Sequence, residues 1–126
     1  MDWGKVLKDM LADYKTDNIN VVVINFDSIA WNEIAGHKKI TVYRVLQELM
    51  VNMKKHSQAD VVAVKFGCEN GKIAIRYTDN GTGMANVKLN YKNGLKNAEN
   101  RISAIDGTLT FDTLTGGLKV NCFFPV

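Results

Sequence analysis

A chain of 126 residues with a net charge of +3 is long enough for one domain with a real hydrophobic core and too short for two comfortable ones. Its residues are 46% hydrophobic and 23% charged, which is ordinary for a soluble globular protein, and no apolar run approaches the roughly 20 residues of a membrane span. The mild, dispersed charge argues against nucleic-acid or direct membrane contact. Cys68 and Cys122 are too few for a disulfide framework or a zinc pattern, which favours a reducing, cytoplasmic setting. We expect a single domain over residues 1–126.

The first half of the chain predicts two helices and one strand. Residues 20–26 are β-branched and apolar enough for a buried strand, and residues 27–39 show no period and are expected to form a loop. The first helix is indicated by apolar residues at helical spacing, namely Trp3, Val6, Leu7, Met10, Leu11 and Tyr14. The second helix, residues 40–57, is marked in the same way by Val42, Val45, Leu46, Leu49, Met50 and Met53.

The second half predicts two hairpins around a third helix. Residues 61–66 and 72–78 are strand-like and are joined through Asn70-Gly71, a dipeptide suited to a tight turn. The third helix carries Leu95, Ala98, Ile102 and Ile105 and stops at Asp106-Gly107. Residues 108–112 and 118–124 alternate around Thr115-Gly116-Gly117 as the second hairpin. The expected fold is an α+β two-layer sandwich, a mixed five-stranded sheet with three helices on one face.

Three polar residues of the second helix, Glu48, Asn52 and His56, stand at i, i+4 and i+8. They form a stripe beside the apolar face, so they border whatever the helix packs against. A stripe of this kind is a candidate site, and it is also compatible with a solvated helix edge.

The sequence DNGTGM, residues 79–84, places a carboxylate and two glycines directly after a predicted strand. The stretch lacks the alternating oxygens and final glutamate of a calcium loop, and the chain has no P-loop sequence. A simple turn is the competing interpretation. Further on, Asn93-Gly94-Leu95 opens the third helix as we predict it, either as an ordinary cap or as exposed amides suited to an anion.

In chain order, the segments ELMVNMKKHSQA, YTDNGTGM, NGLKNAENRISAIDGTLTF and GGLKVNCFFP resemble the ATP-binding catalytic domain of sensor histidine kinases. This domain belongs to the GHKL superfamily, which has the Bergerat-type fold and includes gyrase, Hsp90 and MutL. The resemblance covers essentially the whole chain and is greatest to the nitrate-sensor and membrane-fluidity-sensor kinases.

The resemblance implies ATP and Mg²⁺ as cofactors and gives the candidate residues their roles. Asp79 would accept a hydrogen bond from the exocyclic amine of adenine, where guanine would present a repelled carbonyl oxygen. Gly81 and Gly83 would let the backbone approach the ring. Asn52 would be the magnesium ligand, and Glu48 would orient a metal-bound water or accept a proton from the attacking nucleophile.

Further nucleotide contacts are implied at the phosphates. Lys55 and His56 match basic residues near the phosphates, although a lysine at a helix end also complements the helix dipole. The amides around Gly94 would receive the phosphates, beneath a lid formed by residues 84–93 that carries Lys88 and Lys92. The remaining contacts implied by the resemblance are Met84, Asn93 and Leu95.

The resemblance also implies partners and leaves alternatives open. Paired dimerisation helices carrying a phosphoacceptor histidine would precede this domain in a larger receptor, and a response regulator would act downstream. Within this chain, His37 is expected in a surface loop. Leu118 departs from the family, which usually has Thr or Ser there to hold adenine through water, and this puts tight binding in doubt. An anti-sigma-factor serine kinase and a non-catalytic nucleotide-binding module are the alternatives, whereas a gyrase-type clamp normally requires a longer domain.

Overall fold

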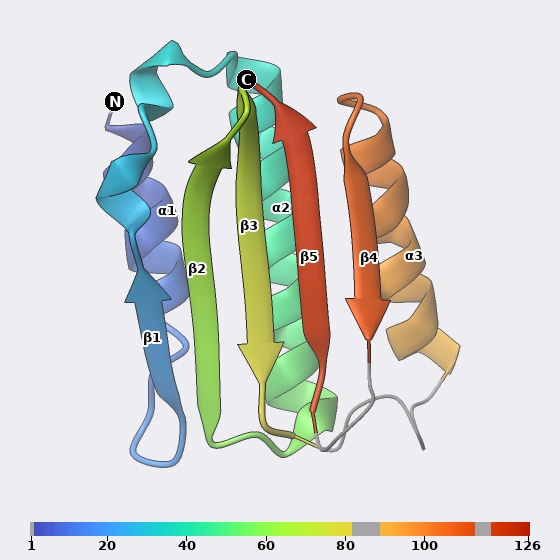
Figure 1. The fold of residues 1–126 in the computed structure, drawn as a ribbon. Helices are drawn as coiled ribbons and strands as arrows, with labels where there is room; N and C mark the ends of the chain where they lie inside the picture. Colours follow the sequence, from blue (N-terminus) through green and yellow to red (C-terminus); the bar gives the residue numbers. More distant parts are fainter. Residues whose placement is uncertain (1, 82–88, 113–116) are drawn as a thin grey trace.

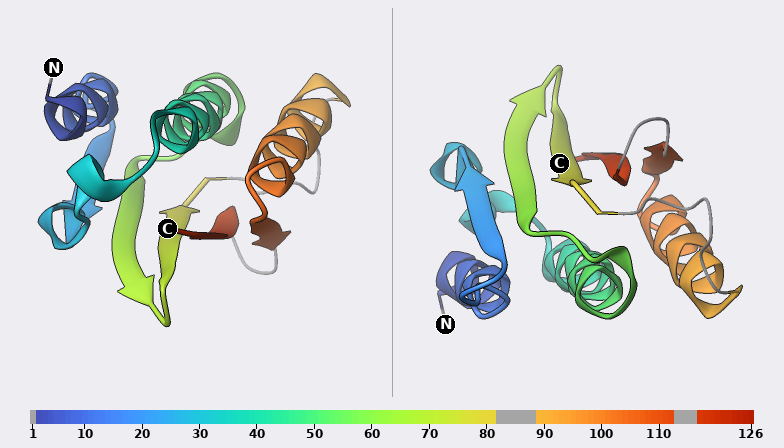
Figure 2. Two further views of the ribbon diagram at one scale, coloured as in Figure 1. Left: turned by 90° about the horizontal axis from the view of Figure 1, so that it is seen from above. Right: turned by 90° about the horizontal axis from the view of Figure 1, so that it is seen from below.

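The computed structural model describes residues 2–81, 89–112 and 117–126. These residues form two layers, a sheet of five strands and three α-helices that all lie on one of its faces (Figure 1, Figure 2). The strand order is β1-β2-β3-β5-β4, in which β1 is parallel to β2 and the other neighbours are antiparallel. The expected α+β sandwich with a mixed sheet is confirmed.

The helix α1, Trp3–Ala12, begins at Asp2, whose side chain accepts a hydrogen bond from the backbone N–H of Lys5 at 3.1 Å. This cap satisfies one of the amides that a helix start leaves unpaired. Leu7 and Leu11, one turn apart, are fully buried against the core. The apolar spacing in the sequence therefore identifies the correct helix and the correct face.

The strand β1, Asn20–Ile24, lies at the edge of the sheet, and the expectation of a buried strand is wrong. Val22 and Ile24 are 36% and 39% exposed. The alternating side chains of a strand face opposite sides, and helices cover only one side of this sheet, so the second set of valines and isoleucines stays in contact with water.

The segment after β1 is not a simple loop. Two 3₁₀ helices, Phe26–Ser28 and Trp31–Glu33, bury Phe26 and Trp31 beside α1, and α2 already begins at Gly36. His37 consequently lies in the first turn of α2 rather than in a loop, and its side chain is exposed as expected. Short 3₁₀ turns lack the 3.6-residue period, which explains why the sequence pattern missed them.

The helix α2 is Gly36–Asn52, and the following residues Met53–Ser57 form a π-helical turn that ends at Gln58 with φ of +57°. We predicted one continuous α-helix to residue 57, and this boundary is wrong. A π-turn pairs residues five apart instead of four. The i, i+4 spacing of the α-helix therefore holds for Glu48 and Asn52, and the side chain of His56 lies outside the described residues.

The strands β2, Val61–Glu69, and β3, Lys72–Asp79, form the predicted hairpin. Asn70 and Gly71 both take positive φ, +54° and +77°, as the tight turn requires. On the other side of β3 lies β5, Lys119–Pro125, which also pairs with β4, Thr108–Asp112. The second hairpin is thus confirmed as a strand pair, and the Thr115-Gly116 part of its turn is outside the described residues.

The helix α3, Leu89–Ser103, ends as predicted, because Asp106 takes a φ of +63° and the N–H of Gly107 donates to the carbonyl oxygen of Ile102 at 2.9 Å. Its start differs from the prediction. Asn93 and Gly94 were expected to open the helix, yet Gly94 is the sixth residue of α3 as described. Gly94 therefore lies inside the helix, where it packs against α2.

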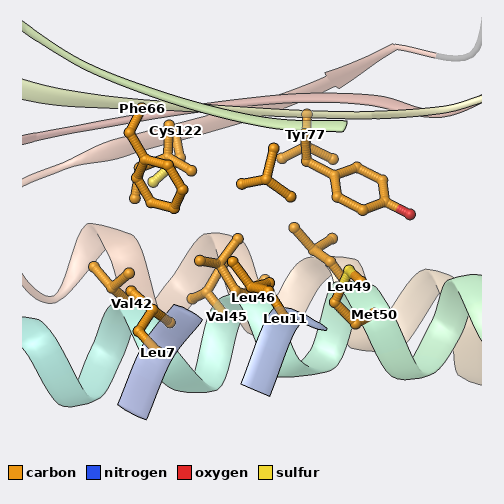
Figure 3. Close-up of a cluster of buried hydrophobic side chains, with 14 of the residues drawn as sticks. Leu7, Leu11, Val42, Val45, Leu46, Leu49, Met50, Phe66, Tyr77 and Cys122 are labelled. Carbon is orange, nitrogen blue, oxygen red and sulfur yellow. The ribbon is translucent and has the colours of Figure 1, made fainter. Parts of the chain in front are cut away.

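The core lies between the two layers (Figure 3). Side chains from α1 and α2 meet the helix-facing residues of the strands, including Phe66 on β2, Tyr77 on β3 and Cys122 on β5. Each large apolar side chain buried in this way contributes roughly 1.5–3 kcal/mol of transfer free energy. This rigid core holds the ends of β3, α2 and α3 in fixed positions relative to one another.

Candidate functional site

Most of the candidate residues gather at one end of the molecule. Figure 1 shows the C-terminal ends of α2 and β3, the N-terminal end of α3 and the start of β5 at the lower end of the two layers. Asp79 is the last residue of β3, and Asn52 is the last residue of α2. Segments that are far apart in the sequence thus bring a carboxylate and an amide to the same end of the interlayer space.

Asp79 is 8% exposed, and its carboxylate is held by three donors. Its Oδ1 accepts the backbone N–H groups of Gly81 at 3.0 Å and Leu118 at 3.2 Å. Its Oδ2 accepts the hydroxyl of Tyr77 at 2.6 Å. An ionised carboxylate has about four acceptor positions, so among the residues that the structure describes one position is left without a donor, on Oδ2.

The strand β5 approaches Asp79 closely enough to fix its backbone as well. The N–H of Asp79 donates to the carbonyl oxygen of Leu118 at 3.0 Å, so these two residues are bonded in both directions. Gly117, with φ of +151°, leaves no room for a side chain, because a Cβ there would overlap the carbonyl oxygen of Asp79. Leu118 itself is 2% exposed, so its side chain belongs to the core while its backbone holds Asp79.

Asn80 anchors the turn that follows Asp79. Its Oδ1 accepts the backbone N–H groups of Asp60 and Val61, both at 3.0 Å, and its Nδ2 donates to the carboxylate of Asp60. Asn80 thereby ties the end of β3 to the start of β2. The side chain of Asn80 is thus occupied by the start of β2, whereas the largely buried carboxylate of Asp79 is bonded to Tyr77, Gly81 and Leu118.

Glu48 and Asn52 stand one turn apart on α2, with Asn52 Nδ2 and Glu48 Oε1 separated by 3.5 Å, the outer limit of a hydrogen bond. Asn52 is 6% exposed and Glu48 is half-buried. Gly94 of α3 faces this pair, since a Cβ on Gly94 would overlap Glu48 Oε1 and lie 2.9 Å from Asn52 Nδ2. The glycine therefore admits the two polar side chains between the helices.

The structure describes only some of the other candidate residues. Lys55 is exposed on the π-turn. The side chain of His56 and all of Gly83 and Met84 are outside the described residues, as is the first half of the expected lid, residues 84–88. Asn93 is exposed on α3 and Leu95 is fully buried in the core. These six residues keep the roles that the resemblance implies as predictions.

The donor set fits a nucleotide carrying magnesium. Asp79 offers its remaining acceptor position to an amine, and Asn52 Oδ1 accepts no hydrogen bond from any residue that the structure describes, so it remains available to a hard cation. Among the described residues, no three His, Cys, Asp or Glu side chains lie together as a ready-made metal site. A magnesium ion at Asn52 would accordingly need the phosphate oxygens of its nucleotide as further ligands.

The two layers with a mixed five-stranded sheet agree with the Bergerat-type fold that the sequence resemblance implied. The sequence profile described as "Histidine kinase-, DNA gyrase B-, and HSP90-like ATPase" matches residues 37–126, which include every polar candidate discussed above. The chain therefore belongs to the family of histidine kinase-, DNA gyrase B- and HSP90-like ATPases.

Curated relatives are longer proteins with kinase names. The chain is 33% identical over 87 residues to the sensor histidine kinase ComP of Bacillus subtilis, and this alignment covers 66% of this chain and 11% of ComP. It is 30% identical over 122 residues to the signal transduction histidine-protein kinase/phosphatase UhpB of Salmonella typhimurium, covering 97% of this chain and 24% of UhpB. The chain thus spans a quarter or less of these relatives.

Solved structures agree with the fold. The histidine kinase domain of the blue-light activated histidine kinase of Erythrobacter litoralis EL346 superposes with a TM-score of 0.70 at 15% identity, over 98% of this chain and 58% of that chain. The Acinetobacter baumannii histidine kinase AdeS gives a TM-score of 0.63 at 16% identity, over 98% of this chain and 60% of that chain.

Among the described residues, none of the helices has the length and apolar composition needed to span a membrane.

Two residues of the site were missed by the sequence analysis. Tyr77 was considered only as part of a strand, although its position two residues before Asp79 puts both side chains on the same face of β3. Gly117 was considered only as a turn residue, and nothing local in the sequence indicates that it packs on the carbonyl of Asp79. The first could have been found from strand alternation; the second depends on which strand lies beside β3.

Proposed function

We propose that this chain is the ATP-binding catalytic domain of a two-component sensor histidine kinase. In this role it holds Mg-ATP at the lower end of the two layers and presents the γ-phosphoryl group to a histidine of a dimerisation and phosphoacceptor domain. Membership of the ATPase family and the kinase names of the curated relatives support the proposal.

The main observation behind the proposal is the hydrogen bonding and burial of the Asp79 carboxylate. Three donors from the described part of the chain orient its carboxylate, and the acceptor position that they leave on Oδ2 belongs to a largely buried group, 8% exposed. A buried acceptor with a vacant position selects a ligand that brings a donor. The exocyclic amine of adenine brings such a donor, whereas guanine would bring an oxygen to the same place.

The phosphate half of the site would be served by α2. Asn52 would give its amide oxygen to Mg²⁺, and the metal would neutralise charge on the phosphates. Glu48, one turn earlier, would accept the proton of the attacking histidine or orient a water on the metal. Lys55 and His56 on the π-turn would complete the contacts to the phosphates.

The partners follow from the reaction. Phosphoryl transfer in this family asks the protein mainly for positioning and charge neutralisation, so the acceptor histidine must be delivered by a separate domain of the same receptor. The phosphohistidine would then supply a response regulator. Both events would take place in the cytoplasm, where ATP is available.

The test of nucleotide binding is calorimetric titration with Mg-ATP, Mg-ADP and Mg-GTP, repeated with Asp79→Asn. We expect saturable binding of the adenine nucleotides alone and its loss in the variant. Asp27→Asn, an exposed carboxylate outside the site, is the matched control and should bind as the parent chain does. Equal binding of GTP and ATP, or full binding by Asp79→Asn, would contradict the proposal.

The test of transfer uses a histidine-bearing phosphoacceptor fragment and γ-labelled ATP, with Glu48→Gln as the impaired variant. Label that is lost in acid and retained in alkali is expected, because phosphohistidine has this stability. Acid-stable label on a serine would instead favour the anti-sigma-factor kinase. ATP binding without any transfer would favour a non-catalytic module.

A further inference from the structure

Tyr77 is a buried residue whose hydroxyl donates a hydrogen bond to Asp79. Both residues lie on the helix-facing side of β3, two positions apart, and Tyr77 is 1% exposed. Figure 3 shows its ring at the edge of the core cluster near Leu49 and Met50, with the hydroxyl oxygen directed away from Val45 and Leu46. A buried hydroxyl needs a polar partner, and here the carboxylate of Asp79 is one.

The bond between the two residues has the geometry of a strong interaction. The oxygen atoms of Tyr77 and Asp79 Oδ2 are 2.6 Å apart, within the range of a hydrogen bond between a hydroxyl and an ionised carboxylate. The two backbone donors, from Gly81 and Leu118, both contact Oδ1. Tyr77 is therefore the described residue that holds Oδ2, the oxygen with the remaining acceptor position.

We propose that Tyr77 is a positioning residue for nucleotide specificity: its hydroxyl holds Asp79 Oδ2 so that the one vacant acceptor position of the carboxylate faces the 6-amino group of adenine. The inference rests on the proposed function and deepens it. Without the hydroxyl, Oδ2 has two vacant positions and one fewer restraint, so the carboxylate is less well oriented for a single donor.

The binding experiment uses Tyr77→Phe, which removes one oxygen atom and keeps the ring in the core. Two ligands are titrated in the presence of Mg²⁺, ATP and purine riboside triphosphate, which has a hydrogen in place of the 6-amino group. We expect ATP to bind about five- to tenfold more weakly, the scale of one hydrogen bond, and purine riboside triphosphate to change less than twofold. The control is Tyr43→Phe on α2, whose ring contacts Trp3 at 5.8 Å and should leave both affinities unchanged.

Each other outcome is decisive. An equal loss for both ligands would mean that Tyr77 only supports the fold, and no loss for either would mean that its hydroxyl does not act on the amine; both results would overturn the inference. Failure of the parent chain to bind ATP would overturn the proposed function and the inference with it. Binding of ATP by the parent chain with unchanged affinity in Tyr77→Phe overturns the inference alone.

A second measurement does not depend on nucleotide. The free energies of unfolding of Tyr77→Phe, Asp79→Asn and the double variant form a cycle that isolates the interaction between the two side chains. We expect the double variant to be less destabilised than the sum of the single variants. Additive effects would show that the two side chains act independently and would overturn the positioning role.

Discussion

Gly94 on α3 and Glu48 on α2 are in such close contact that a methyl group on Gly94 would overlap Glu48 Oε1. The same methyl group would lie 2.9 Å from Asn52 Nδ2. The glycine that the sequence suggested as a helix start is thus inside the helix, where it makes space for two polar side chains. Its place in the site comes from helix packing rather than from exposed amides.

Replacement of Gly94 by Ala should destabilise the protein and weaken Mg-ATP binding. Alanine normally favours a helix over glycine by about 1 kcal/mol, but the overlap with Glu48 forces the side chain or the helix to move, at a cost of roughly 1–3 kcal/mol. Urea unfolding and calorimetry would measure the two effects. Gly36→Ala is the matched control, because no atom lies within 4 Å of its added Cβ; a Gly94→Ala protein as stable as this control would contradict the packing argument.

Replacement of Asn52 by Ala should remove the contribution of magnesium to ATP affinity. Asn52 Oδ1 is the buried acceptor that we assign to the cation, so the variant should bind ATP equally in Mg²⁺ and in EDTA, while the parent chain should bind more tightly in Mg²⁺. Calorimetry under both conditions provides the comparison. A variant that keeps the full magnesium effect would place the metal elsewhere.

Asp79→Ala should cost more stability than Asp79→Asn. Alanine leaves the N–H of Leu118 and the hydroxyl of Tyr77 buried without this acceptor, a loss of about 2–4 kcal/mol. Asparagine keeps an oxygen for the backbone donors and should cost about 1 kcal/mol. Urea unfolding would rank the variants, and equal stabilities would argue that the three bonds to Asp79 contribute little to the fold.

Cys122 should be inert in the native protein and should make stability depend on alkaline pH. Burial raises the pKa of its thiol from 9.0 to about 12, whereas Cys68 is exposed. A thiol reagent at pH 8 should therefore modify Cys68 alone until denaturant is added. Two rapidly reacting thiols in the native protein would disprove the burial of Cys122.

The sign of the pH effect follows from linkage. Because the folded-state pKa is raised, the unfolded chain releases this proton first, so the stabilisation is complete below pH 9 and is lost as the pH rises toward 12. Between pH 8 and pH 10.5 the loss should be about 2 kcal/mol. Cys122→Ala should lack this component, so the difference in unfolding free energy between the two proteins should change with pH; a constant difference would refute the assignment.

Periodicity in the sequence was sufficient for the three α-helices, the five strands and the general architecture, but it missed the two 3₁₀ helices and the π-turn. Apolar residues at helical spacing located α1 and the apolar face of α2, and the Asn70-Gly71 turn located the first hairpin, because each of these signals is local. The boundaries that failed have no local period. The π-turn after Asn52 and the start of α3 before Gly94 are the two examples.

The sequence by itself determined which polar residues were candidates for the site. Glu48 and Asn52 stand one helical turn apart in a predicted helix, and Asp79 comes directly after a predicted strand. Only the tertiary structure decided which groups surround them. The hydroxyl of Tyr77 and the backbone of Leu118 reach Asp79 because β3 and β5 are neighbours, and Gly94 reaches Glu48 because α2 and α3 pack together. Such contacts join residues up to 46 positions apart, and packing of the whole chain, not any local pattern, brings them within reach.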